Sequence, residues 1–236
     1  MLTIIVPVYN EKKFIKLILK KLINLKKIKK QIIVVDDGST DGTREILKNE
    51  FLKNKKISKI LFHKKNKGKG AAIKSAQKFI KGIYVVIQDA DLEYNPADLI
   101  KLYKFIDKSK TKVIYGSRVL GKNKFQNTQN FTHFIRIWAN YILTLISNFV
   151  NNQKLTDAHT CYKMFNSKLF KKIKLFEKGF AFCPEVTTKI SLYNIKINEI
   201  PISYNGRTYD DGKKISSLDG LVAIYCLLKY RFFKNR

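Results

Sequence analysis

The sequence predicts an α/β fold with a Rossmann-like, mainly parallel sheet flanked by helices. Short β-branched runs suited to buried strands alternate with helix-forming segments throughout residues 1–116, and this alternation is typical of βαβ units. A cluster of polar and turn residues follows most of the predicted strands. Because ligands bind beyond the carboxyl ends of the strands in such sheets, we expect these clusters to meet at one edge.

Within this first half, the predicted strands span residues 2–8, 31–35, 57–62, 85–87 and 113–115. The first helix is indicated by apolar residues that recur at helical spacing from Phe14 to Leu25, with lysines on the opposite face. Turn residues and an N-cap signal in residues 36–43 predict that a second helix follows over residues 44–51. Further helices are predicted over residues 71–79 and 96–107, the latter with Pro96 at an early position.

The second half has a different pattern. Residues 131–150 form a long aromatic and aliphatic segment, residues 195–204 resemble a strand, and residues 219–233 predict an apolar helix that ends in basic residues. We find no internal repeat and no linker. We therefore expect one domain over residues 1–236, with an N-terminal half to residue 116, a second half to residue 218 and a C-terminal helix.

Charge and cysteine content limit the classes of function. The net charge of +29, from 47 Lys and Arg against 18 Asp and Glu, favours anionic partners such as nucleic acid, a membrane surface or a phosphorylated substrate. The lysines are dispersed and form no basic stripe with interleaved aromatic residues, so we expect no nucleic-acid partner. Three widely spaced cysteines argue for a reducing compartment and against a disulfide framework.

Two carboxylates stand where the strand of residues 85–87 runs out into a loop. Asp89 and Asp91 are separated by one residue, so extended geometry places both side chains on the same side of the chain. Carboxylates this close repel each other unless a cation lies between them. A hard divalent ion that keeps open positions for a diphosphate fits this pair, and a solvated acidic turn is the alternative interpretation.

Taken together, six motifs in order resemble glycosyltransferase family 2, which has the GT-A nucleotide-diphospho-sugar transferase fold. The resemblance covers approximately residues 1–220. Within the family, the chain is most similar to the dolichyl-phosphate mannose synthases and the bacterial polyprenyl-phosphate glycosyltransferases. No single motif is specific. The motifs are residues 5–11 (IVPVYNE), 35–41 (VDDGSTD), 66–71 (NKGKGA), 89–92 (DADL), 116–118 (GSR) and 199–202 (EIPI).

This resemblance implies a donor site at the ends of the first strands. It implies that Asp37 accepts a hydrogen bond from the nucleotide base, with capping of a helix as the competing role, and that Lys69 approaches the phosphates. The implied cofactor is Mg²⁺ or Mn²⁺, held by Asp89 and Asp91. Glu93 is a further candidate ligand, at a position where a glutamine is frequent in such synthases. The residues implied to shape the nucleotide pocket are Pro7, Tyr9 and Glu11.

The resemblance also assigns several cations to the reaction. Arg118 is expected to face the active site, and Arg207 and Lys214 lie in a polar loop that resembles the closing segment of the family. Cations in these places neutralise the leaving diphosphate and exclude water. Arg136 interrupts an apolar segment and matches the position where relatives bind the acceptor phosphate, although its side chain could also reach toward solvent along an apolar surface.

Two further carboxylates have open roles. Asp157 and Glu185 are each interpreted as a general base, as a helix cap or as the partner of an arginine, and Glu185 is expected just before a helix. The base role is needed if the acceptor is a glycan hydroxyl. It is not needed if the acceptor is a phosphate, which is already anionic near neutral pH.

The function implied by the resemblance is an inverting, metal-dependent transfer of a sugar from a GDP- or UDP-sugar to a polyprenyl phosphate. The expected location is the cytoplasm. Peripheral attachment to the inner face of the cytoplasmic membrane is a further expectation, which follows from a lipid acceptor. The first residues lack the pattern of a signal peptide, and no apolar run reaches about 18 residues. Transfer to a glycan hydroxyl is the main alternative, and a basic nucleic-acid-binding protein is a distant one. A nucleotidyltransferase is disfavoured because residues 7–11 lack a glycine-rich signature.

Overall fold

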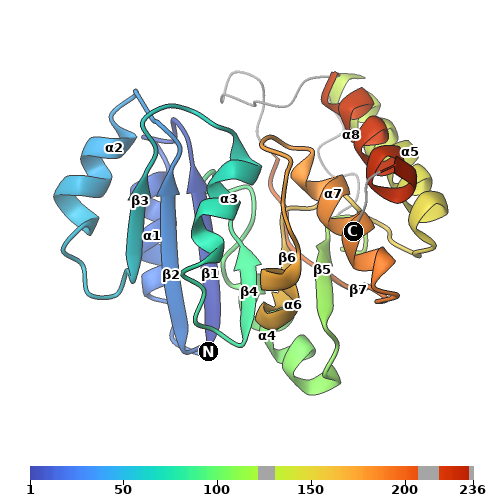
Figure 1. Cartoon of the computed structure of the whole chain (residues 1–236). Coiled ribbons are helices and arrows are strands. Elements are labelled where there is room, and N and C mark those ends of the chain that lie inside the picture. Colours follow the sequence, from blue (N-terminus) through green and yellow to red (C-terminus); the bar gives the residue numbers. More distant parts are fainter. Residues whose placement is uncertain (122–130, 207–217, 234–236) are drawn as a thin grey trace.

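In the computed structural model, residues 1–121, 131–206 and 218–233 are described, without the side chains of residues 131–136 and 218. The described residues contain one seven-stranded sheet in the order β3-β2-β1-β4-β6-β5-β7 (Figure 1). The predicted α/β class and mainly parallel sheet are confirmed. The strands are β1 Leu2–Val8, β2 Lys30–Asp36, β3 Lys59–Phe62, β4 Tyr84–Ile87, β5 Val113–Ser117, β6 Lys163–Asn166 and β7 Asn198–Pro201.

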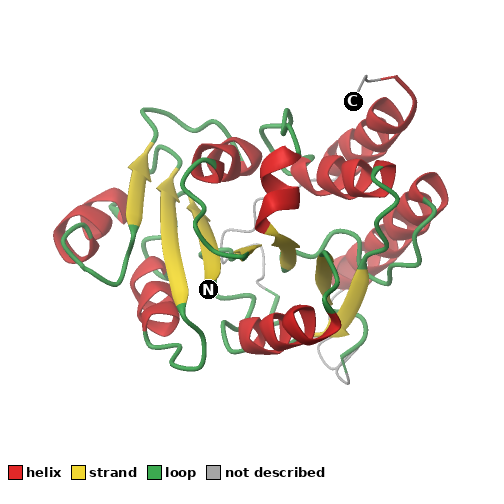
Figure 2. Cartoon of the chain, turned by 60° about the horizontal axis from the view of Figure 1, so that its bottom comes forward, coloured by secondary structure: helices red, strands yellow, loops and turns green. Residues whose placement is uncertain are grey.

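The helices lie on both faces of this sheet and beyond its β7 end. Helices α1 and α4 lie on one face, and α3, α6 and α7 on the other (Figure 2). Helix α5 packs against α7 and α8 beside the second half of the sheet. Their bounds are α1 Ile15–Ile23, α2 Thr43–Ile46, α3 Lys69–Gln77, α4 Asp98–Ser109, α5 Phe131–Asn151, α6 Ser167–Lys172, α7 Phe182–Leu192 and α8 Leu218–Leu228, with the π-helical turns η1 Leu47–Phe51 and η2 Lys229–Phe233.

Burial explains why the first strands read as continuous apolar runs. Every residue of β1 is buried, and β1 lies between β2 and β4, with all three strands parallel. A strand covered by helices on both faces has no solvent side, so its sequence shows no alternation. The main hydrophobic core accordingly contains side chains from β1, β2, β4, β5 and β6.

The sheet has one antiparallel strand that the sequence pattern does not reveal. Strand β6 pairs antiparallel with both β4 and β5 and so separates two strands that would otherwise be neighbours. It is only four residues long and includes the buried Lys163. A short segment that opens with a lysine gives no strand signal.

Other differences concern element boundaries. The predicted strand over residues 195–204 is only β7, Asn198–Pro201. The predicted helix over residues 44–51 is divided into α2 and η1, and the C-terminal helix ends in η2. Glu185 lies within the first turn of α7 and not before it, which corrects the sequence expectation. No helix among the described residues is both long and apolar enough to cross a membrane.

Candidate active site

The loops after β1 and β2 are joined by hydrogen bonds at the carboxyl edge of the sheet. The backbone N–H of Asp37 donates to the carbonyl of Val8 at 2.8 Å. The N–H of Asn10 donates to Ser39 Oγ at 3.0 Å, and Asn10 Oδ1 accepts from the N–H of Thr40 at 2.9 Å. Two of the polar clusters predicted to meet are therefore in contact.

Asp37 holds the glycine-rich turn that precedes α3. Its Oδ2 accepts from the N–H of Gly68 at 2.7 Å, and its Oδ1 accepts from the N–H of Lys67 at 3.0 Å. His63 Nδ1 lies 2.6 Å from the same Oδ1. In this structure the carboxylate is thus a buried anchor for residues 67–68, and its predicted contact with a nucleotide base stays a prediction.

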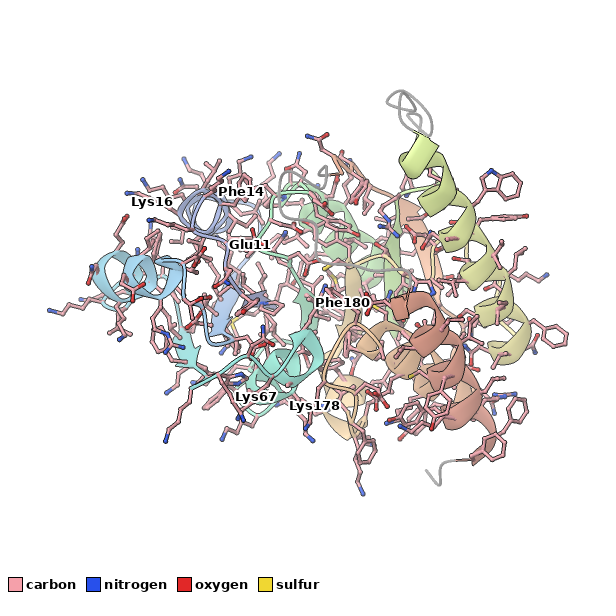
Figure 3. All side chains as sticks on the ribbon, turned by 90° about the horizontal axis from the view of Figure 1, so that it is seen from above. Glu11, Phe14, Lys16, Lys67, Lys178 and Phe180 are labelled. Carbon is pink, nitrogen blue, oxygen red and sulfur yellow. The ribbon has the colours of Figure 1, made fainter. Side chains whose placement is uncertain are left out.

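The glycines of this turn allow it to lie against the loop before α7. Gly68 has φ +93°, in the left-handed region that favours glycine, and a Cβ there would collide with the carbonyl of Lys178. A Cβ on Gly70 would collide with the carbonyl of Glu177. Viewed from the carboxyl edge, Lys67 and Lys178 lie near each other at the rim, with Phe180 further toward the middle (Figure 3).

Lys69, the first residue of α3, forms an ion pair with Asp89. Its Nζ lies 2.6 Å from Asp89 Oδ1 and 2.9 Å from Oδ2, and 3.6 Å from Cys161 Sγ. Burial by itself lowers the pKa of Lys69, but the attraction of Asp89 outweighs this effect and raises the pKa well above its ordinary value. The ammonium is therefore a fixed positive charge at the end of β4.

Asp91 and Glu93 shape the loop that follows Asp89. Asp91 Oδ1 accepts from the N–H of Glu93 at 3.1 Å, and Leu92 between them has φ 63°. Glu93 Oε2 accepts from the hydroxyl of Tyr204 at 2.9 Å. Within residues 1–121, 131–206 and 218–233, no group of three or more His, Cys, Asp or Glu side chains is arranged to hold a metal ion. The set Asp89, Asp91 and Glu93 stays a predicted ligand set.

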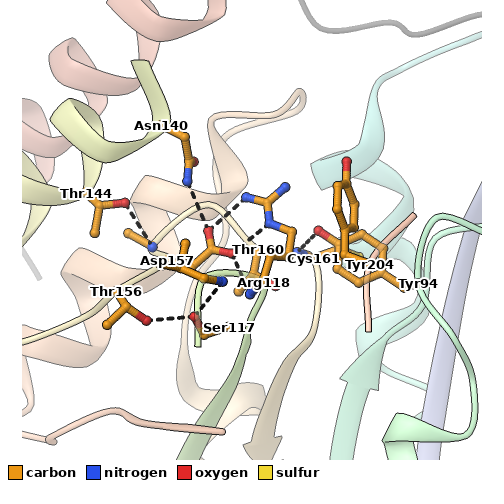
Figure 4. Close-up of polar contacts among 12 residues, drawn as sticks. Tyr94, Ser117, Arg118, Asn140, Thr144, Thr156, Asp157, Thr160, Cys161 and Tyr204 are labelled. Atoms are coloured by element: carbon orange, nitrogen blue, oxygen red, sulfur yellow. Dashed lines mark hydrogen bonds and ion pairs between the residues drawn. The ribbon is translucent and has the colours of Figure 1, made fainter. Parts of the chain in front are cut away.

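Further along the same edge of the sheet, Arg118 and the fully buried Asp157 form a bidentate pair (Figure 4). Arg118 Nε donates to Asp157 Oδ2 at 2.7 Å and Nη2 to Oδ1 at 2.8 Å, and the backbone N–H of Arg118 donates to Oδ2 at 3.1 Å. Although burial raises the pKa of Asp157, the guanidinium outweighs it and lowers the pKa to about 2. Of the roles left open for Asp157, the structure shows the arginine partner.

The turn that carries Asp157 is fixed from β7. Glu199 Oε2 accepts from the N–H and the hydroxyl of Thr156 at 2.6 and 2.8 Å, and its Oε1 accepts from the N–H of Asp157 at 3.0 Å. The hydroxyls of Thr156 and Ser117 are 2.7 Å apart. Glu199 belongs to the motif of residues 199–202, so the motif residue identified in the sequence positions Asp157.

Tyr204 connects the Asp91 loop to the Arg118 pair. Its ring lies 5.1 Å below the guanidinium of Arg118 and 5.2 Å from the ring of Tyr94, and its hydroxyl binds Glu93. Tyr94 in turn accepts from the N–H of Cys161 through its hydroxyl. Two tyrosines therefore hold the loop after β4 against the Arg118 and Asp157 pair, and Figure 4 shows both rings beside the pair.

Glu185 is committed to a structural role. Its Oε1 accepts from the N–H of Phe176 at 2.7 Å and its Oε2 from the N–H of Glu177 at 2.9 Å. Lys189, one turn along α7, lies 2.6 Å from Oε1. Both oxygens therefore hold the loop that covers Gly68 and Gly70.

The other predicted site residues are distributed as follows. Pro7 is buried in β1 opposite Val35, and Tyr9 is half-buried after it. The N–H of Glu11 donates to Thr43 Oγ1 at 2.9 Å. Arg207, Lys214 and the side chain of Arg136 lie outside the described residues.

Four residues that shape the site are not assigned a role by the sequence. Tyr94 and Tyr204 lack a distinctive motif, and Lys163 is a lysine in a chain full of lysines. Buried Lys163 donates to the carbonyls of Ala158 and Thr160 at 2.8 and 2.7 Å and so holds the turn after Asp157. Glu199 lies in a recognised motif, and only that position could have been found from the sequence.

Comparison with known proteins identifies the family of this chain. The family model described as glycosyl transferase family 2 matches residues 3–174. A dolichyl-phosphate β-glucosyltransferase of Saccharomyces cerevisiae is 29% identical, covering 93% of this chain and 71% of its own. A UDP-N-acetylglucosamine–dolichyl-phosphate N-acetylglucosaminyltransferase of Methanococcus voltae is 27% identical, covering 98% and 96%.

Solved structures share the fold. Glucosyl-3-phosphoglycerate synthase of Mycobacterium tuberculosis, in complex with Mn²⁺, UDP and its product, has a TM-score of 0.66 at 15% identity, covering 100% of this chain and 81% of that one. TarS of S. aureus with UDP-GlcNAc has a TM-score of 0.60 at 19% identity, covering 99% and 68%. The chain belongs to glycosyltransferase family 2 and is a glycosyltransferase with the GT-A fold.

Proposed function

We propose that this enzyme transfers a sugar from a nucleoside-diphosphate sugar to the phosphate of a polyprenyl phosphate, with inversion at the sugar carbon. The observation that carries the proposal is that both candidate bases are engaged by other groups. Asp157 is bound by Arg118 and has a pKa of about 2. Glu185 accepts two backbone N–H groups. A phosphate acceptor, with a second pKa of about 6, needs no such base.

The names of relatives agree with this acceptor. Two relatives that match more than nine-tenths of the chain are named for dolichyl phosphate, and one of them is named for a UDP-sugar. The donor is proposed to be a GDP- or UDP-sugar, and no nucleic-acid partner is expected. The proposed location is the cytoplasm, at the inner face of the cytoplasmic membrane, where a lipid phosphate is accessible to an enzyme attached from one side.

The end of β4 supports a site for Mg²⁺ or Mn²⁺. The hard carboxylate oxygens of Asp89 and Asp91 suit such an ion, which prefers oxygen ligands and leaves positions for phosphates. When bound, it supplies positive charge to the departing diphosphate. A related GT-A enzyme was crystallised with Mn²⁺. In the structure, both oxygens of Asp89 contact the ammonium of Lys69, so a bound ion would have to share this carboxylate with Lys69.

The chain's own residues then have separable roles. Lys69 holds a positive charge where the donor phosphates are proposed to bind. One connected set of side chains lies next to the Asp91 loop, formed by the pair of Arg118 and Asp157 and by the ring of Tyr204. In the proposed reaction, the acceptor phosphate oxygen forms the new bond to the sugar carbon while the bond from that carbon to the nucleoside diphosphate breaks. No proton has to leave the acceptor.

The test is a comparison of matched acceptors. Purified enzyme with Mn²⁺ and a panel of GDP- and UDP-sugars is offered a short-chain polyprenyl phosphate, the corresponding polyprenol, and a glycan with free hydroxyls. We expect product from the phosphate alone and with one class of nucleotide. Transfer to the polyprenol or the glycan at a comparable rate would contradict the proposal and favour the hydroxyl acceptor.

A further inference from the structure

Helix α5 has its polar side inward and its apolar side outward. Buried Thr144, Ser147 and Asn151 recur at helical spacing and face the interior, and the N–H of Ala158 donates to Thr144 Oγ1 at 3.3 Å. A surface helix normally buries its apolar stripe and exposes its polar one. The exposed side of α5 carries Trp138, Tyr141, Ile142, Leu145 and Phe149.

Helix α8 and the turn η2 extend this apolar side. They pack against α5 and α7, and α5 and α8 lie side by side in Figures 1 and 2. The large exposed side chains of both helices are called the α5–α8 face below. On α8 and η2 they are Leu221, Val222, Tyr225, Leu228, Phe232 and Phe233.

The α5–α8 face also differs from the rest of the chain in charge. Residues 137–151 and 220–228 contain no Lys, Arg, Asp or Glu, although 28% of the chain is charged, and charged residues border the α8 and η2 part of the face only at Asp219, Lys229 and Arg231 within residues 218–233. By contrast, α1 exposes Lys16, Lys20 and Lys21, and α4 exposes Lys101 and Lys104. A large exposed apolar surface of this kind marks a site where a protein associates with another protein or with a membrane.

We propose that the α5–α8 face docks on a lipid bilayer that carries anionic headgroups. Three of the five exposed side chains on α5 are aromatic, one of them Trp138, and Trp and Tyr are the residues enriched at the boundary between lipid and water. The net charge of +29 attracts an anionic surface. The same charge disfavours the other candidate, a second copy of this chain, because two such molecules repel each other.

The inner side of α5 connects this surface to the candidate active site. Asn140 Nδ2 donates to Asp157 Oδ1 at 3.4 Å, so the helix that faces the bilayer also contacts the Arg118 and Asp157 pair (Figure 4). The docking surface is inferred from the exposed side chains of α5, α8 and η2 and does not depend on the proposed function. Only its link to a lipid acceptor rests on that function. If the acceptor is a lipid phosphate, docking through this face brings the phosphate close to the candidate active site.

Trp138 makes the proposal directly measurable. It is the single tryptophan of the chain, and its side chain is half exposed on the α5–α8 face. Full-length protein is mixed with vesicles of phosphatidylcholine alone or of phosphatidylcholine with phosphatidylglycerol, free of polyprenyl phosphate. We expect flotation with the anionic vesicles at low salt, a blue shift of tryptophan emission, and protection of Trp138 from a water-soluble quencher.

Matched triple variants locate the surface. Tyr141→Glu, Leu145→Glu and Tyr225→Glu together introduce three acidic residues on the face, at positions 51%, 48% and 65% exposed. Leu17→Glu, Leu52→Glu and Ile83→Glu introduce the same charge elsewhere, at 48%, 54% and 62% exposed. We expect the first variant to lose about a hundredfold in vesicle partition, because each large side chain contributes several-fold when its exposed surface is buried. The control should stay within about threefold of the wild type.

Four results would overturn the proposal. One is an absence of binding to anionic vesicles at low salt. Two others are binding without any change in Trp138 emission and binding with equal loss in both triple variants, since either places the contact on another surface. The fourth is a stable dimer in sedimentation that protects Trp138 and is abolished only by the first variant, which assigns the face to a second copy. None of these results bears on transfer to the short-chain polyprenyl phosphate of the acceptor comparison, so the proposed function is tested separately.

Discussion

Arg118 and Asp157, thirty-nine positions apart in the chain, form a fork of two hydrogen bonds at 2.7 and 2.8 Å. Arg118 follows β5 and Asp157 precedes β6, so the pair connects two segments at the edge of the sheet. The carboxyl of Asp157 is fully buried. The guanidinium of Arg118 also lies over the ring of Tyr204, which extends the pair toward the loop after β4. The pair therefore holds the loop after β5 against the turn that precedes β6.

Asp157→Asn should destabilise the protein strongly. Removing the charge of the fully buried Asp157 leaves the guanidinium of Arg118, whose side chain is 22% exposed, without its counter-charge, and breaking a buried ion pair costs about 3–5 kcal/mol. Urea unfolding followed by circular dichroism measures the free energy. The control is Glu50→Gln, which breaks an exposed pair with Lys16 and should cost under about 1 kcal/mol. Equal losses of unfolding free energy in the two variants would contradict the strong contribution assigned to the Arg118 and Asp157 pair.

The contribution of Asp157 should also depend on pH in a defined range. Its pKa is about 2 in the folded protein, below the ordinary value of about 3.9 in an unfolded chain. The stabilisation is thus complete above about pH 4 and is lost as the pH falls through about 2. The free-energy difference between wild type and Asp157→Asn should stay constant from pH 7 to 5 and narrow below pH 4. Narrowing already near pH 6 would exclude Asp157 as its source.

The sequence predicted the fold and the end of β4 well because both have local signals. Apolar runs indicate the buried strands, and Asp89 and Asp91 stand directly where β4 ends. The convergence of the loops after β1 and β2 follows from parallel strands alone. The six motifs in order identified the family, which the match to residues 3–174 confirms.

Contacts between distant segments could not be predicted in this way. Nothing local indicates that Lys69 binds Asp89, that Glu199 holds the turn at Thr156, or that Asp37 anchors Gly68. The inside-out pattern of α5 was visible only as a long apolar segment. Which of its sides is buried depends on packing against α7 and α8, and no periodicity in residues 131–150 reports that packing.

Lys69→Gln should weaken donor binding and strengthen binding of free Mn²⁺. The ammonium holds both oxygens of Asp89, so it competes with a second cation there, while it attracts the phosphates of the donor. We expect nucleotide-sugar affinity to fall by about tenfold, which corresponds to roughly 1.4 kcal/mol. Calorimetry with nucleotide alone and with Mn²⁺ alone separates the two effects.

The control for this change is Lys67→Gln, in the same turn but with an exposed side chain. It removes the same charge without touching Asp89, so Mn²⁺ binding should stay unchanged. If both variants weaken donor binding equally and neither alters Mn²⁺ binding, the effect belongs to the general charge of the turn and the role of Lys69 at Asp89 is wrong.

Asp91→Asn should abolish transfer while the fold stays intact. Asn keeps the Oδ1 atom that accepts from the N–H of Glu93, so the turn is maintained and only the negative charge is lost. Transfer and Mn²⁺-dependent donor binding are measured with and without chelator. Asp41→Asn is the matched control, because Asp41 Oδ1 accepts from the N–H of Thr43 in the same kind of turn. Wild-type activity of Asp91→Asn in excess chelator would refute the metal site.

Glu185→Gln distinguishes the two acceptor hypotheses. General-base assistance contributes about 10²–10⁴-fold to a rate, so losing it would be obvious. Because Glu185 holds the N–H groups of Phe176 and Glu177, we expect a loss of stability but a rate per folded molecule within about tenfold of the wild type. Initial rates with polyprenyl phosphate are normalised to the folded fraction from circular dichroism.

The same assay on Asp157→Asn completes the argument. Its folded fraction should also transfer within about tenfold, because a carboxyl with a pKa of about 2 and both oxygens on Arg118 is a poor proton acceptor at neutral pH. A folded variant of either residue that binds donor normally yet loses several hundredfold in rate would identify that carboxylate as a base. An anionic phosphate has no proton that must be removed, so that result would transfer the proposal to a hydroxyl acceptor.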